Sequence, residues 1–294
     1  MPLGGRRRAR ATPRRSRCTA GSDLRRGGHG TVNRYSAAVS ESSAAFGQSK
    51  YQVRFDWGVD GAARIVPGAH IVVVVDALSF TTAVVVAAEH GVSIAPWNSL
   101  DEDGVAEFAA GLGAVIANRR GEAGPTLSPA SFAVGVQPAV VVLPSPNGGA
   151  LVRGLEADGA VVLAASMRNR SAVASRILSL QEERGERMVV AVIAAGERGD
   201  DANDGRLRFA IEDQLVAGAV IDALVTLGLD HTSPEAAVAC AAYEGLGHAV
   251  VHLIGASGSA AQLNAMGYRG DVRIATERDI TTVVPELVDG VFRA

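Results

Sequence analysis

Acidic and hydroxyl side chains gather where an apolar run gives way to a helical pattern. Asp76 closes the run Ile71–Val75, and Ser79, Thr81 and Thr82 begin the segment that follows. A carboxylate at a strand end can bind a cation, while hydroxyls and backbone N–H groups at a helix start can hold an anion. A plain capping turn uses the same residue types, so this turn alone leaves both interpretations open.

Two loops with the same placement follow later strands. Glu122 lies in a Gly-Glu-Ala-Gly segment after the predicted strand 114–117, and Asn147 and Gly148 lie in a turn after the predicted strand 139–143. The glycines permit a tight backbone approach, and the Asn147 amide can bond a substrate oxygen. A solvated loop acid and an ordinary strand-to-helix turn are the structural alternatives. The turn lacks the Lys-Ser/Thr of a P-loop, so it does not indicate nucleotide binding.

A fourth cluster combines a polar loop with an acidic helix start. Glu197 and Arg198 follow the predicted strand 188–193, and Glu212 and Asp213 lie in the first turns of a long apolar helix. The helix dipole favours acids there without any further function. Several carboxylates at one sheet edge would, however, suit Mg²⁺, a hard ion that takes oxygen ligands and keeps waters for phosphate chemistry.

Alternating strands and helices must position these clusters. The apolar runs predict strands at 51–55, 70–76, 92–95, 114–117, 139–143, 160–164 and 188–193. The helical patterns predict helices at 79–90, 100–110, 150–156, 169–183, 210–227, 234–243, 246–254 and 258–266. The alternation indicates a layered α/β/α fold with a largely parallel sheet and a helix-rich C-terminal third. Ligands of such sheets bind at the carboxyl ends of the strands.

Charge is distributed unevenly along the 294 residues, although the net charge is only −3. Residues 1–45 contain ten arginines and two acids, which leaves 18 basic and 29 acidic residues, a net charge of −11, for the rest. The acidic remainder argues against nucleic acid as the main partner and suits a protein that holds metal cations.

The first 45 residues show neither a helical nor a strand period. We predict that residues 1–45 are a disordered extension and that residues 46–294 form one domain. A basic arm for nucleic acid, a targeting peptide and a dispensable extension remain open for the arginine-rich segment.

Cysteine usage and hydropathy restrict the compartment. Cys18 and Cys240 belong to no CxxC pair or zinc spacing, which favours a reducing, cytoplasmic compartment. The apolar stretches end well short of the roughly 20 residues of a membrane span, so we expect no membrane partner. No GxSxG elbow or GxGxxG fingerprint occurs, and His248 and His252 lack the glutamate of HExxH.

The order of the motifs is more specific than any one of them. DALSFTT at 76–82 is followed by GEAG at 121–124, SPNGG at 145–149, and an AGERG loop with IEDQLVAGAVIDAL at 211–224. In this order the motifs resemble the 2-phosphosulfolactate phosphatase (ComB-like) family. The stretch 255–285, with Asp271 and Asp279, is also similar, so the resemblance spans about residues 51–290.

The resemblance implies hydrolysis of a phosphate monoester on a sulfonated lactate, an α/β fold, Mg²⁺ dependence and a homodimer. The residues expected to be catalytic are Asp76, Glu122 and Asp213. The residues expected to hold the metal are Asp76, Glu212 and Asp213. The residues expected to bind substrate are Ser79, Thr81, Thr82, Asn147, Gly148 and Arg198.

This chain departs from the family at two positions. The family commonly has arginine where Ser79 and Ala123 stand here. Guanidinium groups at both places would clamp phosphate and sulfonate, and Arg119, Arg120 and Arg198 are the nearby arginines that could replace them.

Two hypotheses of different classes follow. The leading one is a Mg²⁺-dependent phosphatase of a small phosphorylated acid, which in the family is 2-phosphosulfolactate and gives 3-sulfolactate and phosphate. The alternative is a diverged, non-catalytic binder of a small anionic metabolite, which the loss of arginine at positions 79 and 123 motivates.

Overall fold

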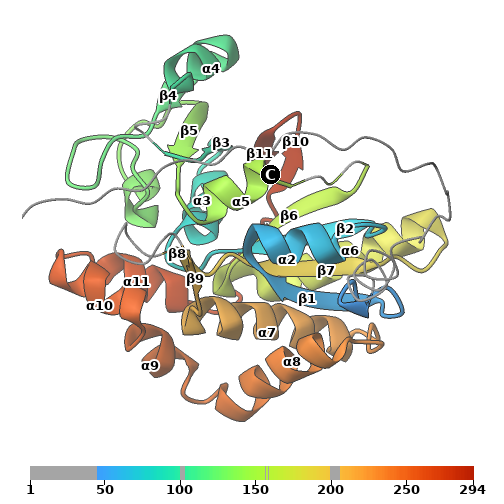
Figure 1. The fold of residues 1–294 in the computed structure, drawn as a ribbon. Coiled ribbons are helices and arrows are strands. Elements are labelled where there is room, and N and C mark those ends of the chain that lie inside the picture. Colours follow the sequence, from blue (N-terminus) through green and yellow to red (C-terminus); the bar gives the residue numbers. More distant parts are fainter. Residues whose placement is uncertain (1–44, 100–102, 156, 158, 199–205) are drawn as a thin grey trace, which may run out of the picture.

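The sheet lies at the centre of the molecule (Figure 1). The structure is a computed structural model that describes residues 45–99, 103–155, 157, 159–198 and 206–294. Apart from Ala45, the predicted extension 1–45 lies outside the described residues. Nine strands of the described residues form this sheet, in the spatial order β1 (Val53–Trp57), β7 (Val190–Ala194), β2 (Ile71–Val75), β6 (Val161–Ala165), β10 (Glu286–Val288), β11 (Val291–Arg293), β3 (Ser93–Trp97), β5 (Val140–Pro144) and β4 (Val115–Ile116).

Parallel pairing dominates this sheet. The pairs formed by β1, β7, β2 and β6, and those formed by β3, β5 and β4, are all parallel. The hairpin of β10 and β11 is antiparallel and joins these two groups by pairing with β6 on one side and β3 on the other. The predicted largely parallel sheet is therefore confirmed.

Helices cover both faces of the sheet (Figure 1). They are α2 (Gly58–Ile65), α3 (Phe80–Glu89), α4 (Val105–Leu112), α5 (Gly148–Arg153), α6 (Arg170–Arg184), α7 (Ile211–Thr226), α8 (Pro234–Leu246), α9 (Val250–Gly255), α10 (Gly258–Ala265) and α11 (Arg269–Thr276). Two 3₁₀ helices are η1 (Pro129–Ala133) and η2 (Met167–Asn169). The last four α-helices follow one another without an intervening strand, as predicted for a helix-rich C-terminal third.

Strand β2 shows why its sequence is apolar throughout. Its odd-numbered residues pack into the core formed with α6, α7 and α8, whereas Val72 and Val74 pack into the core beneath α2, α3 and α5. Successive side chains of a strand point to opposite faces, so a strand covered by helices on both faces needs apolar residues at every position. The α/β/α layering is confirmed.

Some elements were absent from the sequence prediction. These are α2, α11, the β10–β11 hairpin and the two-residue strands β8 (Glu197–Arg198) and β9 (Leu207–Arg208). The hairpin strands are three residues long, too short for a visible alternation, but Asp289-Gly290 between them is a turn signal. Both residues have positive φ, as that turn requires.

Within the described part of the chain, no helix is long and apolar enough to span a membrane.

A glycine sets the close contact between α7 and α8. A Cβ atom added at Gly218 would lie 2.2 Å from the carbonyl oxygen of Ala239, which belongs to the neighbouring backbone. We expect Gly218→Ala to lower the free energy of unfolding by about 1–3 kcal/mol, measured by denaturant titration, because the two helices must move apart. Gly245→Ala in α8 is the matched control, since nothing lies within 4 Å of the added atom there. The control is expected to change stability by less than about 1 kcal/mol, in the stabilising direction. Equal effects of both substitutions would contradict this account of the contact.

Candidate functional site

The Asp76–Thr82 turn is held together by its own hydroxyl groups. The Thr81 Oγ1 atom donates to the Asp76 carbonyl oxygen at 2.8 Å and accepts from the Asp76 N–H at 3.0 Å. The Thr82 Oγ1 atom donates to the Ala77 carbonyl oxygen at 2.7 Å, and both threonine side chains are fully buried. Both hydroxyl groups therefore position the turn, and the contact of these threonines with phosphate oxygens stays a prediction.

The carboxylate of Asp76 is fixed by two backbone donors, one from its own turn and one from a distant part of the chain. Its Oδ1 atom accepts from the Phe80 N–H at 3.2 Å, and its Oδ2 atom accepts from the Gly148 N–H at 2.7 Å. A Cβ atom at position 148 would lie 2.6 Å from that Oδ2 atom and 2.5 Å from the Phe80 ring. The glycine is thus required by the close approach, and the structure brings Asp76 and the 145–149 turn together as the sequence suggested.

Asp213 connects two strand ends in the same way. Its Oδ1 atom accepts from the Ala77 N–H at 2.7 Å, and its Oδ2 atom accepts from the Gly196 N–H at 2.9 Å. Ala77 follows β2, and Gly196, with φ of +66°, follows β7. The side chain of Asp213 is only 3% exposed, so the first turn of α7 delivers a buried carboxylate between two neighbouring strands.

Asp76, Asp213 and the neighbouring Glu212 form an acidic cluster. Burial and mutual repulsion raise the pKa values of its two aspartates. The pKa of Asp76 rises to about 7, chiefly because burial penalises its charged form, and the charges of Glu197 and Glu212 add to the rise. The pKa of Asp213 is raised by burial, by Asp76 and by Glu212. The backbone N–H groups oppose both shifts. A bound cation would relieve the penalty, because it offsets the charges that burial and repulsion disfavour.

The donor set of the cluster is suited to a hard cation. Asp76, Asp213 and Glu212 offer only oxygen atoms, and Glu212 is 2% exposed without a hydrogen bond to its carboxylate from any described residue. Mg²⁺ is commonly held by one or two carboxylates together with water and substrate phosphate, so a complete protein cage is not required.

The predicted three-carboxylate set does not converge on one point. Among the described residues, the group of three ligands whose atoms all lie within 4.8 Å of one another is Asp222, Cys240 and Glu244. Burial and the charges of Glu244 and Asp222 raise the pKa of the Cys240 thiol to about 11. Metal binding by Asp76, Glu212 and Asp213 stays a prediction. The geometry suits a metal ion with only some of these three residues as direct ligands.

Glu197 ties the 145–149 turn to the β8–β9 hairpin. It accepts from Asn147 Nδ2 at 3.1 Å with one oxygen and from Ser259 Oγ at 3.1 Å with the other. The Asn147 Oδ1 atom accepts in turn from the Arg198 N–H at 3.0 Å. Glu197 therefore orients the Asn147 amide and adds a fourth carboxylate to the electrostatics of Asp76. The sequence prediction placed Glu197 in a site loop but gave it no role.

Two predicted site residues have exposed side chains. Glu122 is exposed, and its carboxylate accepts from the Arg119 N–H at 3.0 Å within its own loop. No described hydrogen bond connects it to the acidic cluster, so its described contact shapes its own loop and its catalytic role stays a prediction. The side chain of Arg198 is exposed, and the described contact of this residue uses its backbone.

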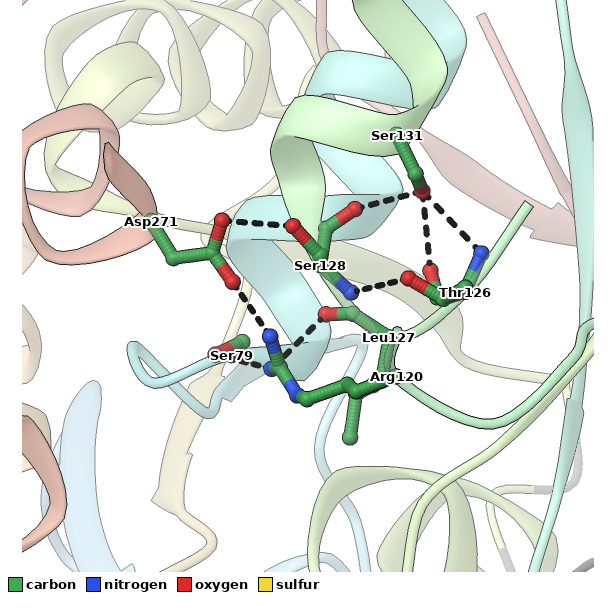
Figure 2. A network of polar contacts seen from close by, with 7 residues as sticks. All are labelled: Ser79, Arg120, Thr126, Leu127, Ser128, Ser131 and Asp271. Atoms are coloured by element: carbon green, nitrogen blue, oxygen red, sulfur yellow. Dashed lines mark hydrogen bonds and ion pairs between the residues drawn. The ribbon is translucent and has the colours of Figure 1, made fainter. Parts of the chain in front are cut away.

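Arg120 reaches the Asp76–Thr82 turn from the loop that follows β4 (Figure 2). Its Nη2 atom donates to Ser79 Oγ at 2.9 Å and to the Leu127 carbonyl oxygen at 3.1 Å, while Nη1 is ion-paired with Asp271. Ser128 Oγ donates to the other oxygen of Asp271 at 2.5 Å. Ser128 carried no sequence signal, because a serine in a Gly/Pro/Ser-rich loop is ordinary.

Comparison with known proteins agrees with the motif order. The 2-phosphosulpholactate phosphatase family model matches residues 63–290. A protein of Thermotoga petrophila named "Probable 2-phosphosulfolactate phosphatase" is 27% identical over 231 residues, which cover 75% of this chain and 90% of that protein. Its namesake from Thermotoga maritima is 26% identical over 231 residues, with the same coverage. The "2-phosphosulfolactate phosphatase" of Methanothermobacter thermautotrophicus is 33% identical over 151 residues, 51% of this chain and 57% of that protein.

The raised pKa of Asp76 predicts how stability depends on pH in the absence of metal. The pKa is about 7 in the folded chain and 3.8 ordinarily, so between those values the folded state binds a proton that the unfolded state has lost. In EDTA the free energy of unfolding should fall as pH rises from 4 to 7, by on the order of 4 kcal/mol from this group. Asp76→Asn should flatten that slope, measured by denaturant titration at several pH values. The control Asp60→Asn, an exposed residue of α2, should keep the wild-type slope. Identical slopes in wild type and Asp76→Asn would refute the prediction.

Proposed function

The chain belongs to the 2-phosphosulpholactate phosphatase family, and on that basis we propose that it is a Mg²⁺-dependent phosphatase of a small phosphorylated acid. The substrate in the names of its relatives, 2-phosphosulfolactate, is the first to test. Its hydrolysis would break the phosphate ester bond and give 3-sulfolactate and phosphate. The observation that carries the proposal is the pair of buried carboxylates, Asp76 and Asp213. They are fixed by four backbone N–H groups, two that follow the adjacent strands β2 and β7 and two at the starts of α3 and α5.

The proposed catalytic and metal-binding residues are Asp76 and Asp213. A carboxylate has about four lone-pair sites, and each of these two uses two of them for backbone donors, so both keep capacity for a cation. Glu212, the buried neighbour of Asp213, is a third oxygen donor for the ion or for one of its waters. When bound, Mg²⁺ would polarise the phosphoryl group and neutralise the charge that develops on it.

Residues of the surrounding turns are proposed to hold the substrate. The Asn147 amide gives one N–H to Glu197, which leaves its second N–H for a substrate oxygen. Ser79 is the N-terminal cap of α3 and accepts from Arg120, which leaves its own hydroxyl proton to donate. The rigid mounting of these groups by hydrogen bonds supports the proposal, because positioning is most of what a phosphoryl-transfer site must supply.

The homodimer implied by the family and the cytoplasmic location indicated by the cysteines are part of the same proposal. Sedimentation equilibrium of the purified chain tests the first. A species at the mass of one chain, 30.2 kDa, across the accessible concentration range would exclude a stable dimer.

Phosphate release tests the proposed function directly. We expect the wild type to release phosphate from 2-phosphosulfolactate in Mg²⁺ and to stop in excess EDTA. Asp76→Asn and Asp213→Asn should each lower kcat/KM by about 100-fold or more, because each removes a charge that the reaction requires. The control Asp60→Asn should stay within about threefold of the wild type.

Two outcomes would contradict the proposal. Turnover that persists in EDTA, or full activity of Asp76→Asn, would exclude the Mg²⁺-dependent mechanism at this site. Tight binding of 2-phosphosulfolactate by calorimetry with no phosphate release would instead favour the non-catalytic binder of a small anionic metabolite.

A further inference from the structure

A guanidinium group stands beside the acidic cluster without belonging to it. Arg120 contacts Ser79, three residues after Asp76, yet the charges that shift the pKa values of Asp76 and Asp213 come from other carboxylates. Arg120 is instead paired with Asp271. The turn at Asp76–Thr82 therefore has carboxylates at its strand end and a cation at its helix end.

Arg120 is held from several sides. Asp271 is 2% exposed and accepts from Arg120 and from Ser128 with its two oxygens (Figure 2). The guanidinium also lies over the ring of Tyr268, 5.1 Å from its centroid. Arg120 lies in the loop that follows β4, and these partners lie in the turn before η1 and at α11. The fold therefore sets the orientation of the guanidinium group.

The guanidinium of Arg120 has N–H groups that make none of the described hydrogen bonds. An arginine has five N–H donors, and Arg120 directs three of them to Asp271, Ser79 and Leu127. Its side chain is 17% exposed, so part of the group remains accessible. Arginine is also the natural choice in this chain, because Lys50 is its one lysine. A planar guanidinium binds carboxylate and sulfonate oxygens with a geometry that an ammonium does not offer.

We propose that Arg120 determines substrate specificity by binding a second anionic group, a carboxylate or sulfonate, of a substrate whose phosphoryl group lies at Asp76 and Asp213. This inference rests on the proposed function, and it adds to it the residue that selects for the second anionic group. Asp271 acts as a positioning residue, since it neutralises and orients the guanidinium without itself facing the substrate.

The physical advantage is a two-point attachment. The carboxylates of the acidic cluster repel an anionic substrate unless a cation is bound between them. A fixed guanidinium at the helix end attracts the second anionic group of the substrate directly. Fixing both ends of a small substrate orients the phosphoryl group for attack. A phosphomonoester without the second anion should gain none of this attachment.

A purely structural role for Arg120 makes a different prediction. If the guanidinium served only to neutralise buried Asp271, its loss would disturb the site for all substrates alike. Selection for a second anion changes the ratio between two substrates, and that ratio is the quantity to measure.

The test compares phosphoglycolate, which carries a carboxylate, with ethyl phosphate, which does not. We measure kcat/KM for both in Mg²⁺ with the full-length wild type, Arg120→Gln, Arg120→Lys and the control Arg184→Gln, whose side chain at the end of α6 is 45% exposed. The dissociation constants of both probes are measured by calorimetry in parallel. Thermal unfolding of each variant establishes that it is folded.

We expect the wild type to have a higher kcat/KM for phosphoglycolate than for ethyl phosphate. Arg120→Gln should lower the preference by about tenfold or more, and Arg120→Lys by about threefold or more, because a point charge replaces the planar fork. Arg184→Gln should keep the wild-type ratio. If Arg120→Gln does not fold, Arg120→Lys decides by the same criterion.

Failure of this inference is separable from failure of the proposed function. No phosphate release from any substrate would refute the phosphatase, while the ratio of dissociation constants would still test Arg120. An unchanged ratio in the Arg120 variants, an equal loss for both probes, or a wild type without preference would each overturn the role of Arg120.

Discussion

The carboxylate of Asp213 joins the ends of two parallel strands, and the candidate site depends on that junction. It accepts one N–H after β2 and another after β7, in a place that is closed to solvent. Asp76 repeats the arrangement between α3 and α5. Burial and mutual repulsion raise the pKa of both acids despite their backbone N–H partners, and a proton or a cation would offset the remaining penalty. The hydrogen bonds that hold the strand ends together therefore also place two carboxylates where a bound cation would be stabilising.

Most of the fold could be predicted from the sequence because its signals are local. The five apolar residues of β2, all fully buried, indicate a strand covered on both faces, and the long apolar helix α7 is evident from its length. Strand order could not be predicted, since nothing local shows that the short β10–β11 hairpin inserts between β6 and β3. That hairpin ends the chain, and its pairing partners lie far away in the sequence.

The candidate site was predictable where a residue type and a strand end coincide, as at Asp76, Gly148 and Asp213. It was not predictable where the contact is made by a side chain from a distant loop. Arg120 and Asp271 are 151 residues apart, and only the folded chain shows that Arg120 contacts both Asp271 and Ser79. The direction in which a side chain points was equally hidden, since the hydroxyl groups of Thr81 and Thr82 face the backbone.

A crystal structure grown with Mg²⁺ and inorganic phosphate is the most direct test of the central claim, that the carboxylates at these strand ends form a metal and phosphate site. We predict a cation about 2.0–2.1 Å from an oxygen of Asp76 or Asp213, with phosphate bound to it. A cation and phosphate bound elsewhere, for instance at Asp222, Cys240 and Glu244, with the pair of aspartates bound only to backbone N–H groups, would contradict it.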